Sequence, residues 1–486
     1  MRDCRGETGT NFDKGNTMNE TIDTDFDEAA RELRILACAD LHVSATQNLA
    51  GLQPVDRATR RPLVLAQARQ TLAWIGQTAR TNRCDLVLVA GDVYPDPRPL
   101  PAAEAVVQES FASWADAGVL VLVLLGNHDR PNGSGTHALE PLKHLRPAEV
   151  VVLDTFAPQA LVRDGVNGRL AAVAFTDPAG MAGLEVEAWI FPVPYPARAA
   201  AAEVSGSVVV TSAVLAGGFN AVLGAHAQLV PLCREVAPGA PCILFGHGTL
   251  ASAAYNDYQT VPLADSPIST DTFPAFDLAV WGHLHKRQAV ASPVVEDAET
   301  DDGRGMLFTH GYIGSPDRMD FGEEGQPKGV STFAREFVAD DGGPVRERWA
   351  CQFHANPGAR RFVTLHPDEV HDHLTELKAE AERGDQAWVY RVVSPDRDGI
   401  TEAENEVVAG LVRELKACGV TITNGCKVAR ADRARVEDVQ TELGFEGVLS
   451  AVFSARPDLA PDEEAIRGNI RNWAAEQGSA GKVGAA

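Results

Sequence analysis

The chain has 486 residues, of which 45% are hydrophobic and 23% charged, a balance typical of a globular protein with two or three domains. Its formal net charge of −24 argues against the overall basic surface of a general nucleic-acid binder, so any DNA contact must be local. No apolar stretch reaches the roughly 20 residues that span a bilayer, and the polar start of the chain predicts no signal peptide, so no membrane partner is expected.

The first part of the chain divides into a tail and a large domain. Residues 1–31 are polar and acidic without apolar periodicity and predict a disordered tail, in which Met1 and Met18 are alternative starts. Residues 32–350 alternate nearly continuous apolar runs, typical of strands buried on both faces, with helical patterns. The helical faces carry Leu65, Ala68, Leu72, Ile75 and Ala79 in one case and Val107, Phe111 and Trp114 in the other. This alternation predicts an α/β domain.

The eight cysteines are scattered and form no CxxC pair. Cys38 and Cys242 lie inside apolar runs, where buried free thiols are expected. This usage predicts a reducing, cytoplasmic location rather than a disulfide framework.

A second series of strand-like and helical stretches follows the large domain. Residues 358–455 combine the strand-like runs AWVYRVV and VTITNG with the helical stretch TEAENEVVAGLVRELKACG, and predict a small separate α+β domain. Residues 456–486 predict an amphipathic helix in which Ile466, Ile470 and Trp473 form one stripe. Two roles stay open for this stripe, which are packing on the chain's own small domain and docking to a partner protein.

Five apolar runs of the large domain end in side chains of the metal-ligand type. In chain order the runs RILACADLH, LVLVAGD, VLVLLGNHD, CILFGHG and AVWGHLH supply Asp40 and His42, Asp92, Asn127 with His128 and Asp129, His247, and His283 with His285. Ligands at the carboxyl ends of sheet strands converge on one crevice in α/β proteins. Because buried Asp and His are costly without partners, a purely structural explanation would need several independent pairings.

The ligand types narrow the chemistry. Asp, Asn and His without cysteine suit Mn²⁺, Fe²⁺ or Zn²⁺ rather than a structural zinc clamp. The ligands are too many for one ion but enough for two that share a bridging carboxylate. Two ions roughly 3.5–4 Å apart activate water and stabilise an in-line displacement at phosphorus. The pattern therefore predicts phosphoester hydrolysis.

The order DxH…GD…GNHD…GH…GHxH resembles that of the calcineurin-like metallophosphoesterases, over roughly residues 34–290. The resemblance implies a four-layer α-β-β-α sandwich followed by a small α+β capping domain. It implies one divalent ion at Asp40, His42, Asp92 and His285, and a second at Asp92, Asn127, His247 and His283. Asp92 would bridge the ions, and His128 would face the substrate and protonate or stabilise the leaving oxygen.

One position departs from the family pattern. Members commonly carry an Asp or His three residues beyond the bridging Asp, where it orients the catalytic histidine, but this chain has Pro95 there. We expect the adjacent Asp96 to serve instead, because a carboxylate on the far ring nitrogen would fix the tautomer of His128.

Residues 312–330, YIGSPDRMDFGEEGQPKGV, and the earlier IFPVPYP resemble the SbcD-type DNA repair nucleases. That resemblance implies an Mn²⁺-dependent DNA exonuclease and endonuclease that works as a homodimer beside an SMC-like ATPase of the SbcC type, in double-strand break repair or recombination. The chain has no GxxxxGK[ST] loop, so an ATP-driven step would come from the partner. The basic side chains expected to hold the phosphodiester strand are Arg57, Arg61, Arg130 and Arg287.

Two other functions stay open. The first is a phosphoesterase of the same fold that acts on an ester other than DNA; the GSP…DFGE segment and the extra domain argue against it. The second is an inert scaffold that binds an ATPase or DNA; the complete set of metal ligands argues against it.

Overall fold

The computed structural model describes residues 33–45, 63–131, 136–195, 212–251, 267–290, 309–339 and 345–366 except 165, 166, 176, 178, 179 and 182, with 388–392, 422–424, 253, 369, 406, 409, 410 and 413 in addition. The expected tail at residues 1–31 and the expected helix within 456–486 lie outside these residues, as does much of the expected small domain. Within the part of the chain that is described, no helix is both long and apolar enough to cross a membrane.

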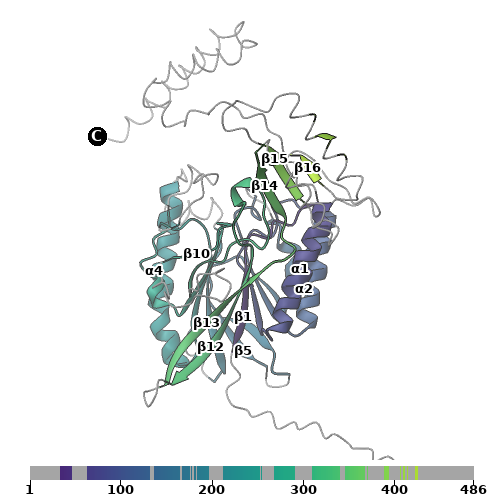
Figure 1. Cartoon of the computed structure of the whole chain (residues 1–486). Helices are drawn as coiled ribbons and strands as arrows, with labels where there is room; N and C mark the ends of the chain where they lie inside the picture. The colour runs from purple at the N-terminus through teal and green to yellow at the C-terminus, as the bar shows by residue number, and fades with distance from the viewer. Residues whose placement is uncertain are drawn as a thin grey trace, which may run out of the picture.

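Two sheets lie face to face in the large domain (Figure 1). The first has the order β13-β12-β1-β2-β3-β4. Its strands are β1 (Arg34–Cys38), β2 (Leu86–Val89), β3 (Leu120–Leu124), β4 (Val150–Leu153), β12 (Gly329–Ala339) and β13 (Val345–Ala355). Strands β1 to β4 are parallel, whereas β12 and β13 form an antiparallel hairpin beside β1.

The second sheet has the order β10-β11-β9-β8-β7-β5-β6. Its strands are β5 (Gln159–Arg163), β6 (Leu170–Ala174), β7 (Val186–Val193), β8 (Cys242–His247), β9 (Leu278–Gly282), β10 (Gln288–Ala289) and β11 (His310–Tyr312). Strands β7, β8, β9 and β11 are parallel to one another. Three short 3₁₀ turns complete the domain, η1 (Glu140–His144), η2 (Phe273–Ala275) and η3 (Phe321–Glu323).

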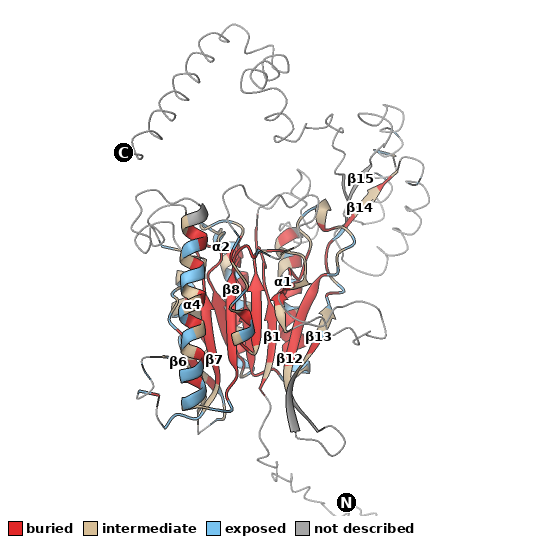
Figure 2. Cartoon of the chain, turned by 90° about the vertical axis from the view of Figure 1, so that its left-hand side faces the viewer, coloured by how far each residue is buried: buried red, intermediate tan, exposed pale blue. Residues whose placement is uncertain are grey.

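The alternation of side chains along each strand builds the four layers. In β2, Leu86 and Leu88 face the second sheet in a shared core, whereas Val87 and Val89 pack on the opposite side. That outer side is covered by α1 (Leu63–Thr81) and α2 (Pro101–Asp116), and the outer side of the second sheet by α4 (Ser212–Val236). Figure 2 shows the strands buried between the helices, while α4 keeps an exposed outer face. The α-β-β-α sandwich is therefore confirmed.

The sequence patterns that predicted these elements are also confirmed. Both helical faces are turned to the first sheet, with Leu72, Ile75, Phe111 and Trp114 buried in its outer core. Cys38 and Cys242 are buried free thiols.

The small third sheet has the order β14-β15-β16 and consists of β14 (Arg361–Leu365), β15 (Trp388–Val392) and β16 (Ile422–Asn424), all parallel. The two strands expected in residues 358–455 are thus present, and positions 406, 409, 410 and 413 of the expected helix are helical. Strand β13 stays in register with β12 as far as Ala355, so the first sheet extends to that residue. The division into a large domain at residues 32–350 and a small domain at 358–455 stays a prediction.

Candidate metal centre

The carboxyl ends of five strands bring the expected metal ligands together. Asp40 and His42 follow β1, Asp92 follows β2 and Asn127 follows β3, while His247 ends β8 and His283 and His285 follow β9. Because β1, β2 and β3 are parallel in the first sheet and β8 and β9 are parallel in the second, these side chains lie at one edge of the sandwich. They form two groups, which we name the first group (Asp40, His42 and His285) and the second group (Asp92, Asn127, His247 and His283).

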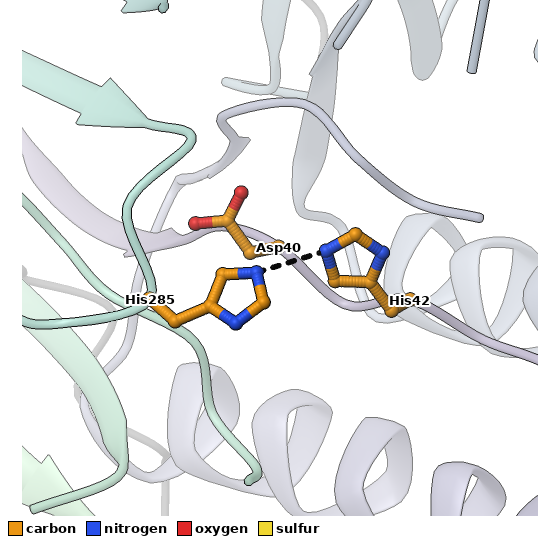
Figure 3. Close-up of side chains that lie close together, drawn as sticks. All are labelled: Asp40, His42 and His285. Atoms are coloured by element: carbon orange, nitrogen blue, oxygen red, sulfur yellow. Dashed lines mark hydrogen bonds between the residues drawn. The ribbon is translucent and has the colours of Figure 1, made fainter. Parts of the chain in front are cut away.

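The first group brings two imidazole nitrogens against each other (Figure 3). His42 Nε2 lies 3.0 Å from His285 Nε2, and the carboxylate of Asp40 completes a cluster whose ligand atoms are all within 4.8 Å of one another. Asp40 is fully buried, and its Oδ1 accepts a hydrogen bond of 3.0 Å from the backbone N–H of His283. This contact links the first group to the loop that supplies the second.

The second group is arranged around an amide oxygen. Asn127 Oδ1 lies 2.8 Å from His247 Nε2 and 2.9 Å from His283 Nδ1. Asp92 Oδ2 is 3.4 Å from His247 Nε2 and 3.9 Å from His42 Nε2. Asp92 therefore lies between the two groups, in the place that a bridging carboxylate needs.

Backbone strain is concentrated at the same residues. Asp40, His42, Asp92 and His283 have φ values of 53°, 43°, 51° and 103°, in the region that side-chain-bearing residues rarely adopt. Such conformations persist only where surrounding contacts hold them, and they cluster at functional sites. Gly126, before Asn127, is required by packing, because a Cβ there would lie 2.2 Å from both the backbone nitrogen and Oδ1 of Asp92.

The protonation states of His42, His283 and Asp92 fit metal ligands. Burial, together with the charge of neighbouring histidines, lowers the pKa of His42 to about 3 and that of His283 to about 3, so both rings are neutral at neutral pH. Burial alone would raise the pKa of Asp92, but His247 and His42 beside it hold that pKa well below its usual range. Neutral imidazoles and an ionised carboxylate are the forms that bind metals. The nitrogen and oxygen ligand set, without cysteine, therefore fits two divalent ions of the Mn²⁺, Fe²⁺ or Zn²⁺ type.

His128 lies beside the two groups with its side chain exposed, and its ring meets that of His42 edge to face at 5.1 Å between centroids. Its Nδ1 lies 3.1 Å from the carbonyl oxygen of Pro95. The expected partner Asp96 is not at this position, since its Oδ1 accepts instead from the backbone N–H of Arg98 at 2.8 Å. The Asp96 carboxylate closes a local turn of its own loop, which leaves the preceding carbonyl to face the ring.

The arginines expected to bind substrate have different outcomes. The side chain of Arg287 turns onto the β12–β13 hairpin, where Nε donates to Ser331 Oγ at 3.2 Å and the guanidinium lies 4.9 Å from the ring of Phe353. Its part in substrate binding stays a prediction. Arg130 is half-buried, and its part in substrate binding stays a prediction. Arg57 and Arg61 lie outside the described residues.

Two carboxylates have supporting roles that were not predicted from the sequence, although Asp129 was named there at the end of an apolar run. Asp129 is buried and accepts from the backbone N–H groups of Tyr94 and Gly126 at 3.0 and 3.1 Å, which ties the loops after β2 and β3 together. Glu323 is buried with its Oε1 2.6 Å from His285 Nδ1. The sequence feature that marks the region of Glu323 is the high density of charged residues in 317–328. These residues supported the resemblance to the SbcD-type nucleases but did not show that Glu323 contacts His285.

Comparison with known proteins places these features in a family. The family model described as Calcineurin-like phosphoesterase matches residues 33–287. The chain is 26% identical over 280 residues to the SbcD component of the nuclease SbcCD of Escherichia coli K12, covering 54% of this chain and 58% of that protein. With the SbcD component of Rhodobacter capsulatus it shares 26% identity over 307 residues, covering 62% and 65%. The chain thus matches less than two thirds of the length of either relative. A dimetal phosphatase structure from Danio rerio matches at 11% identity with a TM-score of 0.36, covering 67% of this chain and 96% of that one, a score too low to carry an argument.

Proposed function

Because the chain belongs to the calcineurin-like phosphoesterase family, we propose that it is a nuclease that hydrolyses phosphodiester bonds of DNA with two divalent ions, Mn²⁺ in particular. The observation that carries the proposal is the convergence of the first and second groups on the shared carboxylate of Asp92. The likeness to two nuclease components supports DNA as the substrate class.

When bound, the two ions would supply an activated water and stabilise the negative charge of an in-line displacement at phosphorus. The protein holds the ligands for this chemistry in place before substrate arrives. Asp92 is fixed by the N–H of His128, which donates to Oδ1 at 2.8 Å, so Oδ2 is left to face both groups. His247 Nδ1 lies 2.8 Å from the carbonyl oxygen of Ala90, an arrangement that directs its Nε2 into the second group.

His128 is the proposed proton donor. The Pro95 carbonyl can only accept a hydrogen bond, so Nδ1 carries a proton and Nε2 is the atom that exchanges one with the substrate. The exposed ring can reach a leaving oxygen, and in the protonated form its Nε2–H is positioned to neutralise the developing charge.

The proposed partners follow from the same likeness. We assign the protein a cytoplasmic role beside an SMC-like ATPase of the SbcC type, as a homodimer, in double-strand break repair or recombination. The relatives carry the name of one component of the nuclease SbcCD, which supports such a partnership. The stripe of Ile466, Ile470 and Trp473 is the proposed docking element, with the aromatic side chain as its anchor.

The proposal is tested by incubating the purified protein with Mn²⁺, and separately with Mg²⁺, on linear duplex DNA, circular single-stranded DNA and a chromogenic phosphodiester. We expect Mn²⁺-dependent cleavage of DNA that Asp92→Ala abolishes, since this change removes the shared ligand. Hydrolysis of the chromogenic ester without any DNA cleavage would indicate a different phosphoesterase. A protein that binds both ions but hydrolyses nothing would be a scaffold.

A further inference from the structure

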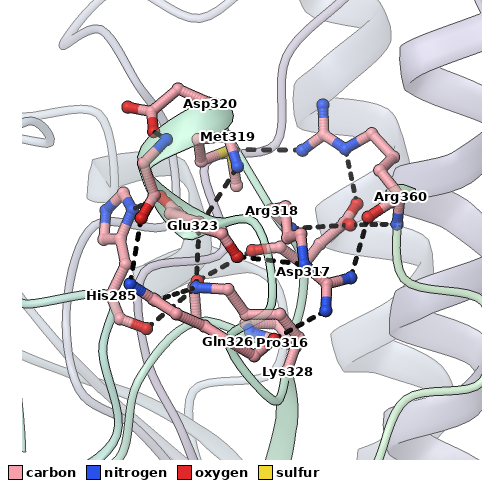
Figure 4. Close-up of polar contacts among 12 residues, drawn as sticks. His285, Pro316, Asp317, Arg318, Met319, Asp320, Glu323, Gln326, Lys328 and Arg360 are labelled. Atoms are coloured by element: carbon pink, nitrogen blue, oxygen red, sulfur yellow. Dashed lines mark hydrogen bonds and ion pairs between the residues drawn. The ribbon is translucent and has the colours of Figure 1, made fainter. Parts of the chain in front are cut away.

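A buried ion pair of Glu323 and Lys328 lies beside His285 (Figure 4). It contacts Nδ1 of the ring, whereas Nε2 faces His42 of the first group. Glu323, from η3, is 1% exposed, and Lys328 is 3% exposed. Burying a carboxylate and an ammonium costs several kcal/mol each unless other groups satisfy their hydrogen bonds. The groups that satisfy Glu323 and Lys328 therefore indicate the role of the pair.

The pair holds His285 at two points. Glu323 Oε1 lies 2.6 Å from His285 Nδ1, while its Oε2 lies 2.6 Å from Lys328 Nζ. Lys328 Nζ also donates to the backbone oxygen of His285 at 3.0 Å and to Ser315 Oγ at 2.9 Å. Both the ring and the backbone of His285 are therefore fixed by one ion pair.

The ion pair also selects the tautomer of His285. An ionised carboxylate only accepts hydrogen bonds, so Nδ1 must donate to Glu323 and the lone pair of neutral His285 is on Nε2. Nε2 is the atom that lies 3.0 Å from His42 Nε2 in the first group. A ring rotated or protonated the other way would not present a lone pair there.

We propose that Glu323, held by Lys328, is a positioning residue that orients His285 and so sets the affinity of the first group for its divalent ion. The inference rests on the proposed two-ion function. It differs from a purely structural role, in which the ion pair would only fasten residues 315–328 to the sheet.

A second buried acid in the same segment provides a matched control. Asp317 is 6% exposed, and its oxygens accept from the backbone N–H of Arg360 at 2.6 Å and from Arg360 Nε at 2.8 Å. This pair fastens the same segment to the residues before β14, but the carboxylate of Asp317 accepts from Arg318 and Arg360 rather than from a metal ligand. Only the backbone oxygen of Asp317, which Asp317→Asn leaves in place, accepts from Ser315 Oγ at 2.7 Å. Figure 4 shows the two acids on different sides of the network.

The test is a titration of metal-stripped protein with Mn²⁺, with free Mn²⁺ followed by electron paramagnetic resonance. We expect the wild type to bind two ions, and Glu323→Gln to bind one as tightly as the wild type and the other about 10–100-fold more weakly, the usual effect of removing a partner of a ligating histidine. Asp317→Asn should lower the melting temperature yet bind both ions as the wild type does. Wild-type affinity for both ions in Glu323→Gln would overturn the inference. A wild type that binds no Mn²⁺ would instead contradict the proposed function.

A measurement on the unaltered chain keeps the inference testable if Glu323→Gln does not fold. In protein labelled with ¹⁵N-histidine and loaded with Zn²⁺, two-bond ¹H–¹⁵N correlations report the tautomer of each ring, and the His285 signals are those lost in His285→Gln. We expect a proton on Nδ1 of His285. A proton on Nε2, or none on either nitrogen, would overturn the inference.

Discussion

The carbonyl of Pro95 takes the place at His128 in which a carboxylate was expected. It accepts from Nδ1 at 3.1 Å and so fixes the tautomer, but it carries no full negative charge to stabilise a protonated ring. The sequence could not show this, because every residue has a carbonyl and only the path of the loop decides which one faces the ring. The hydrogen-bond partner that orients the His128 ring is thus a backbone carbonyl rather than a carboxylate.

Replacing His128 tests its separation from the metal ligands. We expect His128→Gln to retain both ions and to lower kcat by roughly 10²–10⁴-fold, the usual contribution of a general acid–base group. Metal content by elemental analysis and single-turnover hydrolysis are measured on the same preparation. Loss of metal in step with activity would make His128 a ligand instead.

His247 predicts a pH dependence of metal binding. Burial lowers the pKa of His247, but the carboxylate of Asp92 raises it by more, so the pKa is about 9. His247 is therefore protonated at neutral pH in the metal-free protein. An ion in the second group must displace that proton, so its affinity should fall as the pH drops below this pKa. We expect about one proton to be released for each ion bound at this group near neutrality, measured by titration calorimetry in buffers of different ionisation enthalpy. Binding without proton release would contradict the assignment of His247 as a ligand.

At the scale of elements, the centre depends on how closely the loops after β2 and β3 approach each other. The position of Gly126 leaves no room for a Cβ against Asp92, and the carboxylate of Asp129 bonds to both loops. The bridging carboxylate is therefore placed by backbone packing as much as by its own strand.

A single methyl group should disturb this packing. Gly126→Ala is expected to cost about 1–3 kcal/mol of stability and to reduce metal binding, because the loop carrying Asp92 must move. The matched control is Gly217→Ala in α4, where a Cβ would meet nothing within 4 Å and helix propensity predicts a gain of roughly 0.5–1 kcal/mol. Thermal unfolding and Mn²⁺ titration of both variants provide the comparison. Wild-type metal binding in Gly126→Ala would show that the close approach is unimportant.

The same scale shows what the sequence could predict. The positions of the metal ligands were predictable, because apolar runs of strand length end in Asp, Asn or His. The carboxyl ends of parallel strands lie at one edge of a sheet, so these side chains lie close together. The role of Glu323 could not be predicted, because its contact with His285 joins residues 38 positions apart and no periodic pattern in the sequence relates them. The pairing of β13 with β12 as far as Ala355 could not be predicted either, because strand pairing depends on contacts between distant parts of the chain. The contact of Arg287 with Ser331 could not be predicted, because the position of a residue in the sequence does not show which way a long side chain turns.

At the scale of the whole molecule, both sheets contribute to the centre. The first sheet supplies Asp40, Asp92 and Asn127, and the second supplies His247, His283 and His285. The groups are brought together by the apolar core between the sheets, in which Leu88 and Phe245 are completely buried. The metal centre is thus a property of the packed sandwich, and neither sheet could form it alone.

The proposed docking of the C-terminal segment is also a whole-molecule prediction, on residues that lie outside the described part of the chain. Truncation after Ala455 should leave a metal-loaded protein that still cleaves small phosphodiesters but no longer co-purifies with the ATPase partner. The full-length chain is the control. A truncated chain that unfolds or aggregates would favour packing of the stripe of Ile466, Ile470 and Trp473 on the chain's own small domain.

The most direct test of the two-ion centre is anomalous diffraction from crystals of the Mn²⁺-loaded protein. We predict two anomalous peaks roughly 3.5–4 Å apart, the spacing of two-metal sites, on either side of the Asp92 carboxylate. One peak should lie within coordination distance of Asp40, His42 and His285, and the other of Asn127, His247 and His283. A single peak, or peaks away from Asp92, would contradict the assignment of a two-ion centre bridged by Asp92.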